Sequence, residues 1–172
     1  MMGKRSDFER KSRDFYPTPM EAVEPLLEHL PEDFPFAEPC AGNGALIEHL
    51  ETKGVCMWAS DIEPQSEGIH TCDYFDVGFD ELIESDYIIT NPPWNRKLLH
   101  PMIEHLSKQK PTWLLFDADW MHTKQSVPYM NMCSKIVSVG RIKWFGNMTG
   151  KDNCAWYLFD RKVNNTIFYG RT

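Results

Sequence analysis

The chain has 172 residues, 42% of them hydrophobic, and a formal net charge of −7 at pH 7. This length allows one well-buried domain and is too short for two comfortable ones. The acidic balance excludes a strong general polyanion binder, because duplex binding rests largely on lysine and arginine, so any nucleic-acid contact must be local.

Membrane, secreted and metal-binding classes are also disfavoured. The sequence contains no apolar run of about 18 residues and no charged-then-apolar leader, so we expect a cytoplasmic protein without a membrane span. Its cysteines are odd in number and form no Cys-x-x-Cys pair, and its histidines do not cluster at metal-ligand spacings. We therefore predict reduced thiols and no metal.

The chain opens with a basic segment. Residues 1–14 carry more lysine and arginine than acidic residues, which indicates a flexible basic arm or simply a solvated, frayed terminus. We predict a single domain over 15–172. Tyr-Pro-Thr-Pro at 16–19 then leads into a helix, with Thr18 and Glu21 as a capping box, Pro19 at the first helical position and an end near Leu30.

A strand, a glycine loop and a helix follow over 34–53. Gly42 and Gly44 let a ligand approach the backbone closely at a helix start, which suits a carboxylate or a ribose. An ordinary strand-to-helix turn is the alternative. The next predicted strand, 55–60, ends on Asp61, about twenty residues beyond the loop, where a carboxylate can accept hydrogen bonds from ribose hydroxyls. Ile47 stands where a dinucleotide site wants a third glycine, which favours a nucleoside cofactor without phosphates.

Two further predicted strands end on polar residues at the same sheet edge. The strand 69–72 leads to Asp73, which either holds an adenine amino group or caps a turn. The buried strand 87–90 ends at Asn-Pro-Pro-Trp, residues 91–94. Each proline holds the preceding residue extended, so the Asn91 side-chain oxygen and the Pro92 carbonyl present two acceptors beside the indole of Trp94. Although Asn-Pro-Pro is often just a turn, this arrangement suits a planar group bearing an amine.

The last third of the chain is predicted to supply a helix over 97–107 and strands over 112–116, 135–139 and 155–159. A long irregular connection, 140–153, separates the last two strands, and such loops are often functional. It holds Arg141, Lys143 and Phe145, which we predict to bind substrate, with Phe145 covering a base opposite Trp94. Alternatively, Trp144 and Phe145 only pack beneath the loop.

These motifs, in this order, resemble S-adenosylmethionine-dependent, N6-adenine-specific DNA methyltransferases, of the small type carried by phages and mobile elements. About 160 of the 172 residues fit. The resemblance implies an α/β, Rossmann-like methyltransferase fold: a single seven-stranded, mostly parallel sheet with helices on both faces and a C-terminal β-hairpin. It implies S-adenosyl-L-methionine as cofactor, bound by Tyr16, Thr18, Glu38, Cys40, Gly42, Gly44, Asp61, Ile62, Asp73 and Tyr74, and a catalytic motif of Asn91, Pro92, Pro93 and Trp94.

The sequence departs from this family in two ways: Trp94 stands where Tyr or Phe is common, and no separate target-recognition domain is recognisable. We expect adenine in DNA, flipped or single-stranded, to be the substrate, because a large indole suits a flat purine and basic residues lie at 96, 97, 141 and 143. RNA adenine, protein glutamine and a non-catalytic S-adenosylmethionine-binding role are the alternatives. Without a recognition domain, we expect relaxed sequence preference and weak, salt-sensitive DNA binding.

Overall fold

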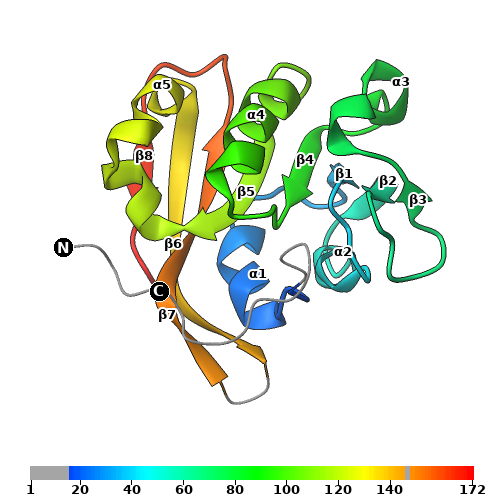
Figure 1. Ribbon diagram of the computed structural model, residues 1–172, viewed down its shortest axis with the longest axis horizontal. Coiled ribbons are helices and arrows are strands. Elements are labelled where there is room, and N and C mark those ends of the chain that lie inside the picture. Colours follow the sequence, from blue (N-terminus) through cyan, green and yellow to red (C-terminus); the bar gives the residue numbers. More distant parts are fainter. Residues whose placement is uncertain (1–15, 146–147) are drawn as a thin grey trace.

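The computed structural model describes residues 16–145 and 148–172, and no side chains are described between 145 and 149. The predicted basic arm, residues 1–14, therefore lies outside the described residues. One eight-stranded sheet organises the molecule, in the order β3-β2-β1-β4-β5-β7-β6-β8 (Figure 1). Its strands are β1 Pro35–Glu38, β2 Val55–Asp61, β3 His70–Thr71, β4 Tyr87–Thr90, β5 Thr112–Asp117, β6 Cys133–Phe145, β7 Met148–Phe159 and β8 Ile167–Tyr169.

The sheet is mostly parallel, as predicted. Only β7 runs antiparallel to its neighbours, β5 and β6, and it forms the predicted hairpin with β6. The predicted count of seven strands is wrong by one because of β8, which has three residues and pairs parallel with β6 at the sheet edge. So short and exposed a strand is defined by its non-local partner rather than by its own pattern.

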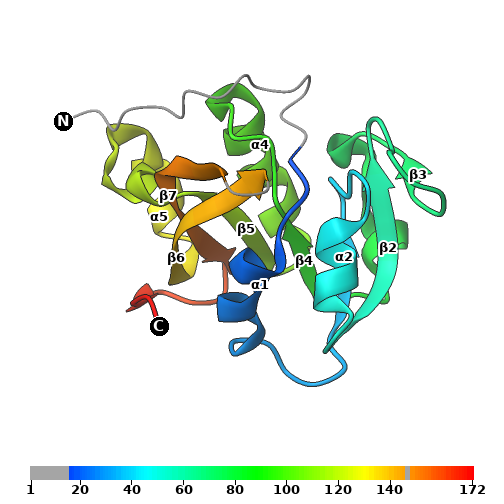
Figure 2. The ribbon, with the colours of Figure 1, turned by 90° about the horizontal axis from the view of Figure 1, so that it is seen from below.

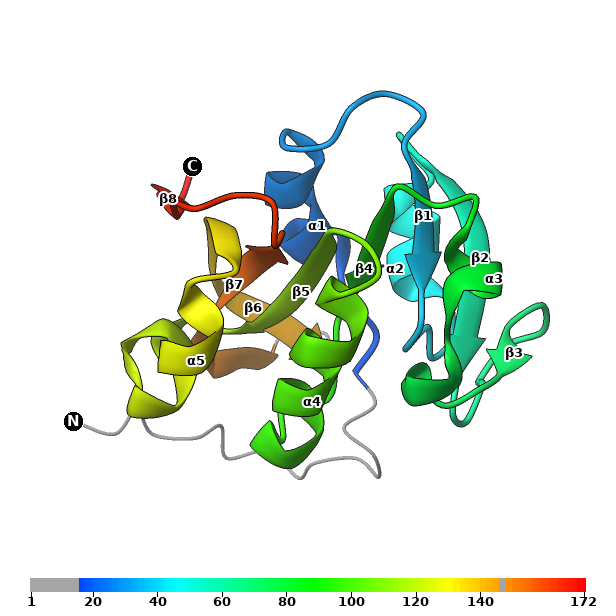
Figure 3. The same ribbon diagram turned by 90° about the horizontal axis from the view of Figure 1, so that it is seen from above.

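Helices cover both faces of the sheet (Figures 2 and 3). One face carries α1 Met20–Leu27 and α2 Ala45–Leu50, and the other carries α3 Phe79–Leu82, α4 Arg96–Ser107 and α5 Val127–Met130. Among the described residues, the connections also include the short 3₁₀ segments Tyr74–Asp76, Ala118–His122 and Lys124–Ser126. Within the described part of the chain, no helix is long and apolar enough to cross a membrane.

Strand β5 shows why both faces are apolar. Trp113 and Leu115 pack with α1 in one buried cluster, whereas Leu114 and Phe116 pack with α4 residues in another. Burying each such side chain stabilises the fold by about 1.5–3 kcal/mol. A strand covered on both sides reads as a continuous apolar run, which is how its position could be predicted from sequence.

The prediction of an irregular connection over 140–153 is wrong. Strand β6 continues to Phe145 and β7 begins at Met148, so most of this stretch is a long antiparallel hairpin whose end reaches past α1 (Figure 1). Burial alternates along it, with Ile142 buried between exposed Arg141 and Lys143. Gly140, the first residue of that predicted connection, lies in an irregular ladder: the register shifts between Ser138 and Gly140, whose φ is 91°.

The predicted capping box at the start of α1 is also wrong. Helix α1 has Pro19 at its N-cap position and no side-chain cap. Thr18 Oγ1 instead accepts a hydrogen bond from Asn91, and Glu21 Oε1 accepts one from the Lys143 backbone N–H. Both side chains therefore serve distant segments, and the helix is held by packing: its residues Ala22, Val23 and Leu26 are fully buried.

Candidate active site

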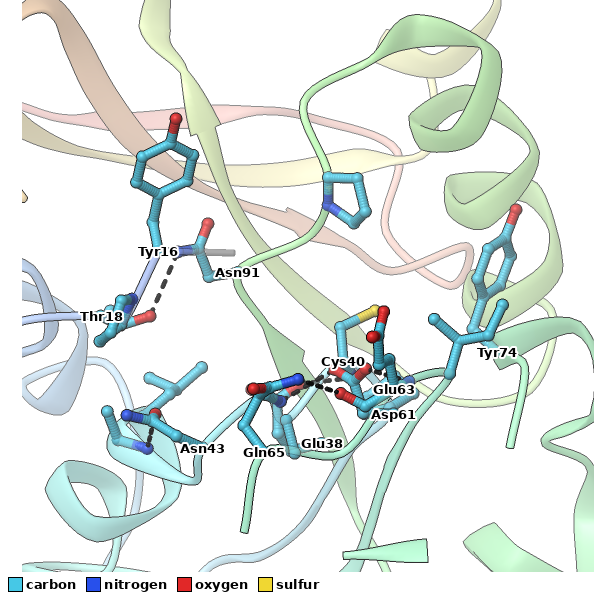
Figure 4. Close-up of a pocket in the computed structure, with 18 of the residues that line it drawn as sticks. Tyr16, Thr18, Glu38, Cys40, Asn43, Asp61, Glu63, Gln65, Tyr74 and Asn91 are labelled. Atoms are coloured by element: carbon cyan, nitrogen blue, oxygen red, sulfur yellow. Dashed lines mark hydrogen bonds between the residues drawn. The ribbon is translucent and has the colours of Figure 1, made fainter. Parts of the chain in front are cut away.

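A cavity of about 800 Å³ opens at the carboxyl ends of β2, β1 and β4, the sheet edge where the sequence motifs were expected to meet (Figure 4). Its lining includes most of the predicted cofactor residues together with two of the predicted catalytic motif: Tyr16, Thr18, Glu38, Cys40, Gly42, Asp61, Ile62, Asp73, Tyr74, Asn91 and Pro93. Residues as far apart in the sequence as Tyr16 and Pro93 thus form one site.

Some predicted residues are not part of that lining, namely Gly44, Pro92, Trp94, Arg141 and Lys143. The side chain of Phe145 lies outside the described residues. Conversely, the lining includes residues that sequence reasoning missed: Asn43, Glu63, Gln65, Asn95, Leu98 and Met102. Glu63 and Gln65 follow Asp61 at the end of β2, so their nearness to a predicted site residue was the available signal.

Asp61 braces the glycine loop. Its Oδ2 accepts a hydrogen bond from the Gly42 N–H at 2.8 Å, and its Oδ1 accepts one from the Glu63 N–H at 2.7 Å. Gly42 and Gly44 have φ values of 56° and 84°, a left-handed region that favours glycine. Each carboxylate oxygen keeps a second lone pair, so Asp61 can still accept hydrogen bonds from ribose hydroxyls while it holds the loop.

Glu38 lies at the end of β1 and is only 1% exposed. Its Oε1 accepts a hydrogen bond from the Cys40 N–H at 2.9 Å. Burial raises the pKa of this carboxyl to about 8, and the nearby Asp61 charge adds to the rise, while the hydrogen bond from the Cys40 N–H opposes it. Burial, with the charges of Glu38 and Asp61, also raises the pKa of the Cys40 thiol well above its usual value. Cys40 is therefore a neutral wall residue rather than a nucleophile.

Asp73, Tyr74 and Ile62 form the far wall. Asp73 Oδ1 accepts a hydrogen bond from the Phe75 N–H at 3.0 Å, so the carboxylate does cap a turn, as the alternative prediction held. Tyr74 donates its hydroxyl to the Leu98 carbonyl at 3.2 Å, and burial raises the pKa of Tyr74 to about 12. Ile62 is 54% exposed, which leaves an apolar surface beside these polar groups.

Asn91 lies at the opposite end of the cavity, directly after β4. Its Nδ2 donates a hydrogen bond to Thr18 Oγ1 at 3.2 Å (Figure 4). Pro92 is buried behind it, while Pro93 lines the cavity. The two prolines carry no N–H, so the backbone around Asn91 offers acceptors and few donors.

Trp94 is anchored on β5 by its indole N–H, which donates to the Leu115 carbonyl at 3.2 Å. Arg96 supports the same loop: it donates to the Trp94 carbonyl at 3.4 Å and forms a 3.2 Å ion pair with Asp117. One ring of the hairpin, Trp144, meets Trp94 edge-on with centroids 6.1 Å apart. These contacts fix the direction of the indole relative to Asn91.

Trp144 also joins the hairpin to the segment before α1. Its ring centroid lies 6.2 Å from that of Tyr16, and the ring packs over Gly150, where an added Cβ would lie 3.2 Å from Trp144 Cδ1. Arg141 and Lys143 are exposed on the same hairpin. The structure thus joins three aromatic rings, Tyr16, Trp94 and Trp144, from segments far apart in sequence, and of these Tyr16 lines the cavity together with Asn91.

The donor set of the cavity fits S-adenosylmethionine better than a nucleotide phosphate. Asp61 and Asp73 supply carboxylates, which repel phosphate but suit a ligand with a positive charge, two ribose hydroxyls and an amine, while Glu38, whose pKa is raised by burial, supplies a carboxyl oxygen as a further acceptor. Among the residues that the structure describes, no cluster of His, Cys, Asp and Glu could hold a metal ion. The cavity thus has hydrogen-bond acceptors at both ends: side-chain carboxylates near the glycine loop, and the side-chain oxygen of Asn91 opposite them.

No family model matches the sequence, and no curated protein matches it. Similarity appears among solved structures. A candidate RNA methyltransferase from Pyrococcus horikoshii has a TM-score of 0.60 at 13% identity, covering 92% of this chain and 93% of the other. A dimethyladenosine transferase from Plasmodium falciparum has a TM-score of 0.56 at 14% identity, covering 86% and 63%. The M protein of the type I restriction enzyme EcoKI has a TM-score of 0.55 at 12% identity, covering 89% and 47%.

These likenesses define the fold. The chain has the α/β, Rossmann-like methyltransferase fold, as its motifs predicted. At such low identities the comparisons concern architecture alone, and function must be argued from the site.

Proposed function

We propose that this protein is an S-adenosylmethionine-dependent methyltransferase that modifies the N6 amino group of adenine in DNA. The observation that carries this proposal is the single cavity with the Asp61-braced glycine loop at one end and Asn91 at the other. A cofactor site and a site for an amine are thereby adjacent, which transfer of one methyl group requires.

At the cofactor end, Asp61 would hold the ribose, Asp73 and Tyr74 the adenine, and Glu38 with the glycine loop the amino-acid portion. S-adenosylmethionine supplies an electrophilic methyl group on a sulfonium. The residues of the chain orient it and need no nucleophile of their own. The raised pKa of Cys40, caused first by burial, accords with that passive role.

At the other end, Asn91 Oδ1 would accept a hydrogen bond from the target amine, and a second would go to the carbonyl of Pro92, a buried residue next to the cavity lining. These bonds draw the nitrogen lone pair out of conjugation with the ring and aim it along the line of transfer. The substrate nitrogen would attack the methyl carbon: as the N–C bond forms, the S–C bond to that methyl group breaks and its electron pair returns to sulfur. The proton that the nitrogen then sheds passes to water. Asn91 acts by orientation and polarity rather than as a base.

Two features favour a nucleic acid over a protein amide. Tyr16 lines the cavity with Asn91 and belongs to a group of aromatic rings with Trp144 and Trp94, and flat bases gain more from aromatic neighbours than a glutamine side chain does. The exposed Arg141 and Lys143 provide local positive charge on an otherwise acidic chain. The names of the Plasmodium and EcoKI proteins, a dimethyladenosine transferase and the M protein of a restriction enzyme, accord with a base as acceptor.

The decisive experiment supplies labelled S-adenosylmethionine with single-stranded DNA, duplex DNA, RNA or protein in separate low-salt reactions. We expect label in DNA, and digestion followed by mass spectrometry should identify N6-methyladenine. The Asn91→Ala protein serves as the matched control for contaminating activity. Label in protein or RNA, with DNA unlabelled, would overturn the substrate assignment, and failure to bind the cofactor in calorimetry would overturn the proposal as a whole.

A further inference from the structure

Thr18 has a role that its neighbours in sequence do not explain. Although it precedes α1, it does not cap that helix, and its side chain is buried at 5% exposure. Its hydroxyl lies instead 3.2 Å from Asn91 Nδ2, a residue 73 positions away at the end of β4 (Figure 4). Because this buried hydroxyl forms its hydrogen bond with a side chain far away in the sequence, the hydrogen bond indicates a specific function.

The backbone on both sides of this hydrogen bond is stiff. Thr18 stands between Pro17 and Pro19, is β-branched, and is held extended because it precedes a proline. Asn91 is held extended in the same way by Pro92. The Thr18 segment leads directly into α1. That helix is tied to the sheet by a hydrogen bond from Trp156 Nε1 on β7 to the Ala22 carbonyl at 2.8 Å. The separation between Thr18 and Asn91 is therefore set by the core.

A carboxamide needs such a constraint. The terminal torsion of asparagine is broad and nearly two-fold, so without a partner either its oxygen or its nitrogen can face the cavity. Only the oxygen can accept a hydrogen bond from a substrate amine. With Nδ2 engaged by Thr18 Oγ1, the oxygen end remains available for that role.

We propose that Thr18 is the positioning residue of the acceptor site: it holds the Asn91 carboxamide in the orientation in which Oδ1 receives the amine hydrogen. This inference rests on the proposed function, since it assigns Thr18 a part in the same reaction. It differs from the expectation, implied by the resemblance, that Thr18 binds the cofactor. A cofactor contact would change affinity, whereas a positioning contact changes turnover.

Kinetics and calorimetry separate these roles. Thr18→Val replaces the hydroxyl by a methyl group of similar size, and we expect kcat to fall about tenfold with the Kd for S-adenosylmethionine unchanged. Thr18→Ser restores the hydroxyl and should recover most of that loss. In an Asn91→Ala background, Thr18→Val should cause no further loss, because its effect passes through Asn91. Thr18→Ala provides the same test if the valine methyl group disturbs folding.

A second measurement does not depend on activity. In ¹⁵N-labelled protein, the side-chain amide signals of Asn91 can be assigned by their absence in Asn91→Ala. We expect them to shift in Thr18→Val and to return toward the wild-type position in Thr18→Ser. Unchanged signals, a raised Kd with normal kcat, or an additive loss in the double variant would each overturn the proposal. A wild-type protein that transfers no methyl group would contradict the proposed function, while the amide signals would still decide whether Thr18 holds Asn91.

Discussion

At the glycine-loop end of the cavity, side-chain carboxylates bind the backbone, with Asp61 accepting from the Gly42 N–H and Glu38 from the Cys40 N–H. At the Asn91 end, a side chain binds a side chain, and prolines stiffen the backbone on either side. The first arrangement makes the loop conformation depend on the carboxylates. In the second, the prolines hold the backbone, so its conformation does not depend on the hydrogen bond between Asn91 and Thr18.

This difference implies that substitutions at the two ends have different consequences. Removing a carboxylate leaves backbone N–H groups without acceptors, so binding and stability should fall together. Removing Asn91 leaves a backbone that the prolines still hold, so turnover should fall without a large change in either. Substitutions at each end test whether this separation is real.

The largest expected effect is at the acceptor end. Asn91→Ala should lower turnover by about 10²–10³, the scale of losing one preorganised polar group, with cofactor affinity and melting temperature nearly unchanged. Labelled methyl transfer and calorimetry measure the two quantities. Asn165→Ala, an exposed asparagine in the loop before β8, is the matched control. A near-normal rate in Asn91→Ala would remove the basis of the mechanism.

At the cofactor end, Asp61→Ala should weaken cofactor binding by roughly tenfold or more and lower the free energy of unfolding by about 1–3 kcal/mol, because Gly42 and Glu63 lose their acceptor. Calorimetry and urea denaturation report these effects. Glu67→Ala, which removes an exposed carboxylate further along the same loop, is the control. If Asp61→Ala binds the cofactor as well as wild type, the ribose assignment is wrong.

Substitutions in the β6–β7 hairpin should affect DNA binding and leave cofactor binding unchanged. Replacing both Arg141 and Lys143 by Gln should weaken DNA binding roughly three- to tenfold and reduce the log–log slope of its salt dependence by about one for each phosphate that is no longer neutralised. Cofactor affinity should not change. Lys162→Gln removes an exposed charge beyond the opposite end of β7 and should leave both affinities unchanged. Equal DNA affinity in the double variant would exclude this hairpin as a binding surface.

The last prediction is a gradual change in stability with pH at Glu38. Its pKa is raised from 4.5 to about 8, chiefly by burial, so the folded state prefers the protonated carboxyl. That contribution to stability is fully present below pH 4.5 and is lost as pH rises through 8. The unfolding free energy of wild type should therefore fall relative to Glu38→Gln between about pH 5 and pH 9. Parallel curves from urea titrations would show that Glu38 does not titrate in this window.

Sequence alone determined the sheet edge on which the site is built. A strand with a continuous apolar run, followed by a turn-forming or proline-rich motif, has a definite end, and parallel strands bring such ends to one edge. For this reason Gly42, Asp61, Asp73 and Asn91 could be placed together from their order along the chain. The features that place these residues, namely the strand before each of them and its turn motif, are local and lie within short stretches of chain.

Only the tertiary structure decided which partner each polar group takes. Thr18 and Glu21 have the spacing of a capping box, yet they bind Asn91 and Lys143, because packing brings those segments within reach. Trp94 follows the acceptors in sequence, but the Leu115 carbonyl on β5 fixes its direction. Residues 140–153 have no clear strand pattern of their own, and the pairing of β6 with β7 makes most of them a hairpin. Hydrogen bonds between residues far apart in the sequence depend on how the core assembles. No local sequence pattern determines which of these residues come within hydrogen-bonding distance.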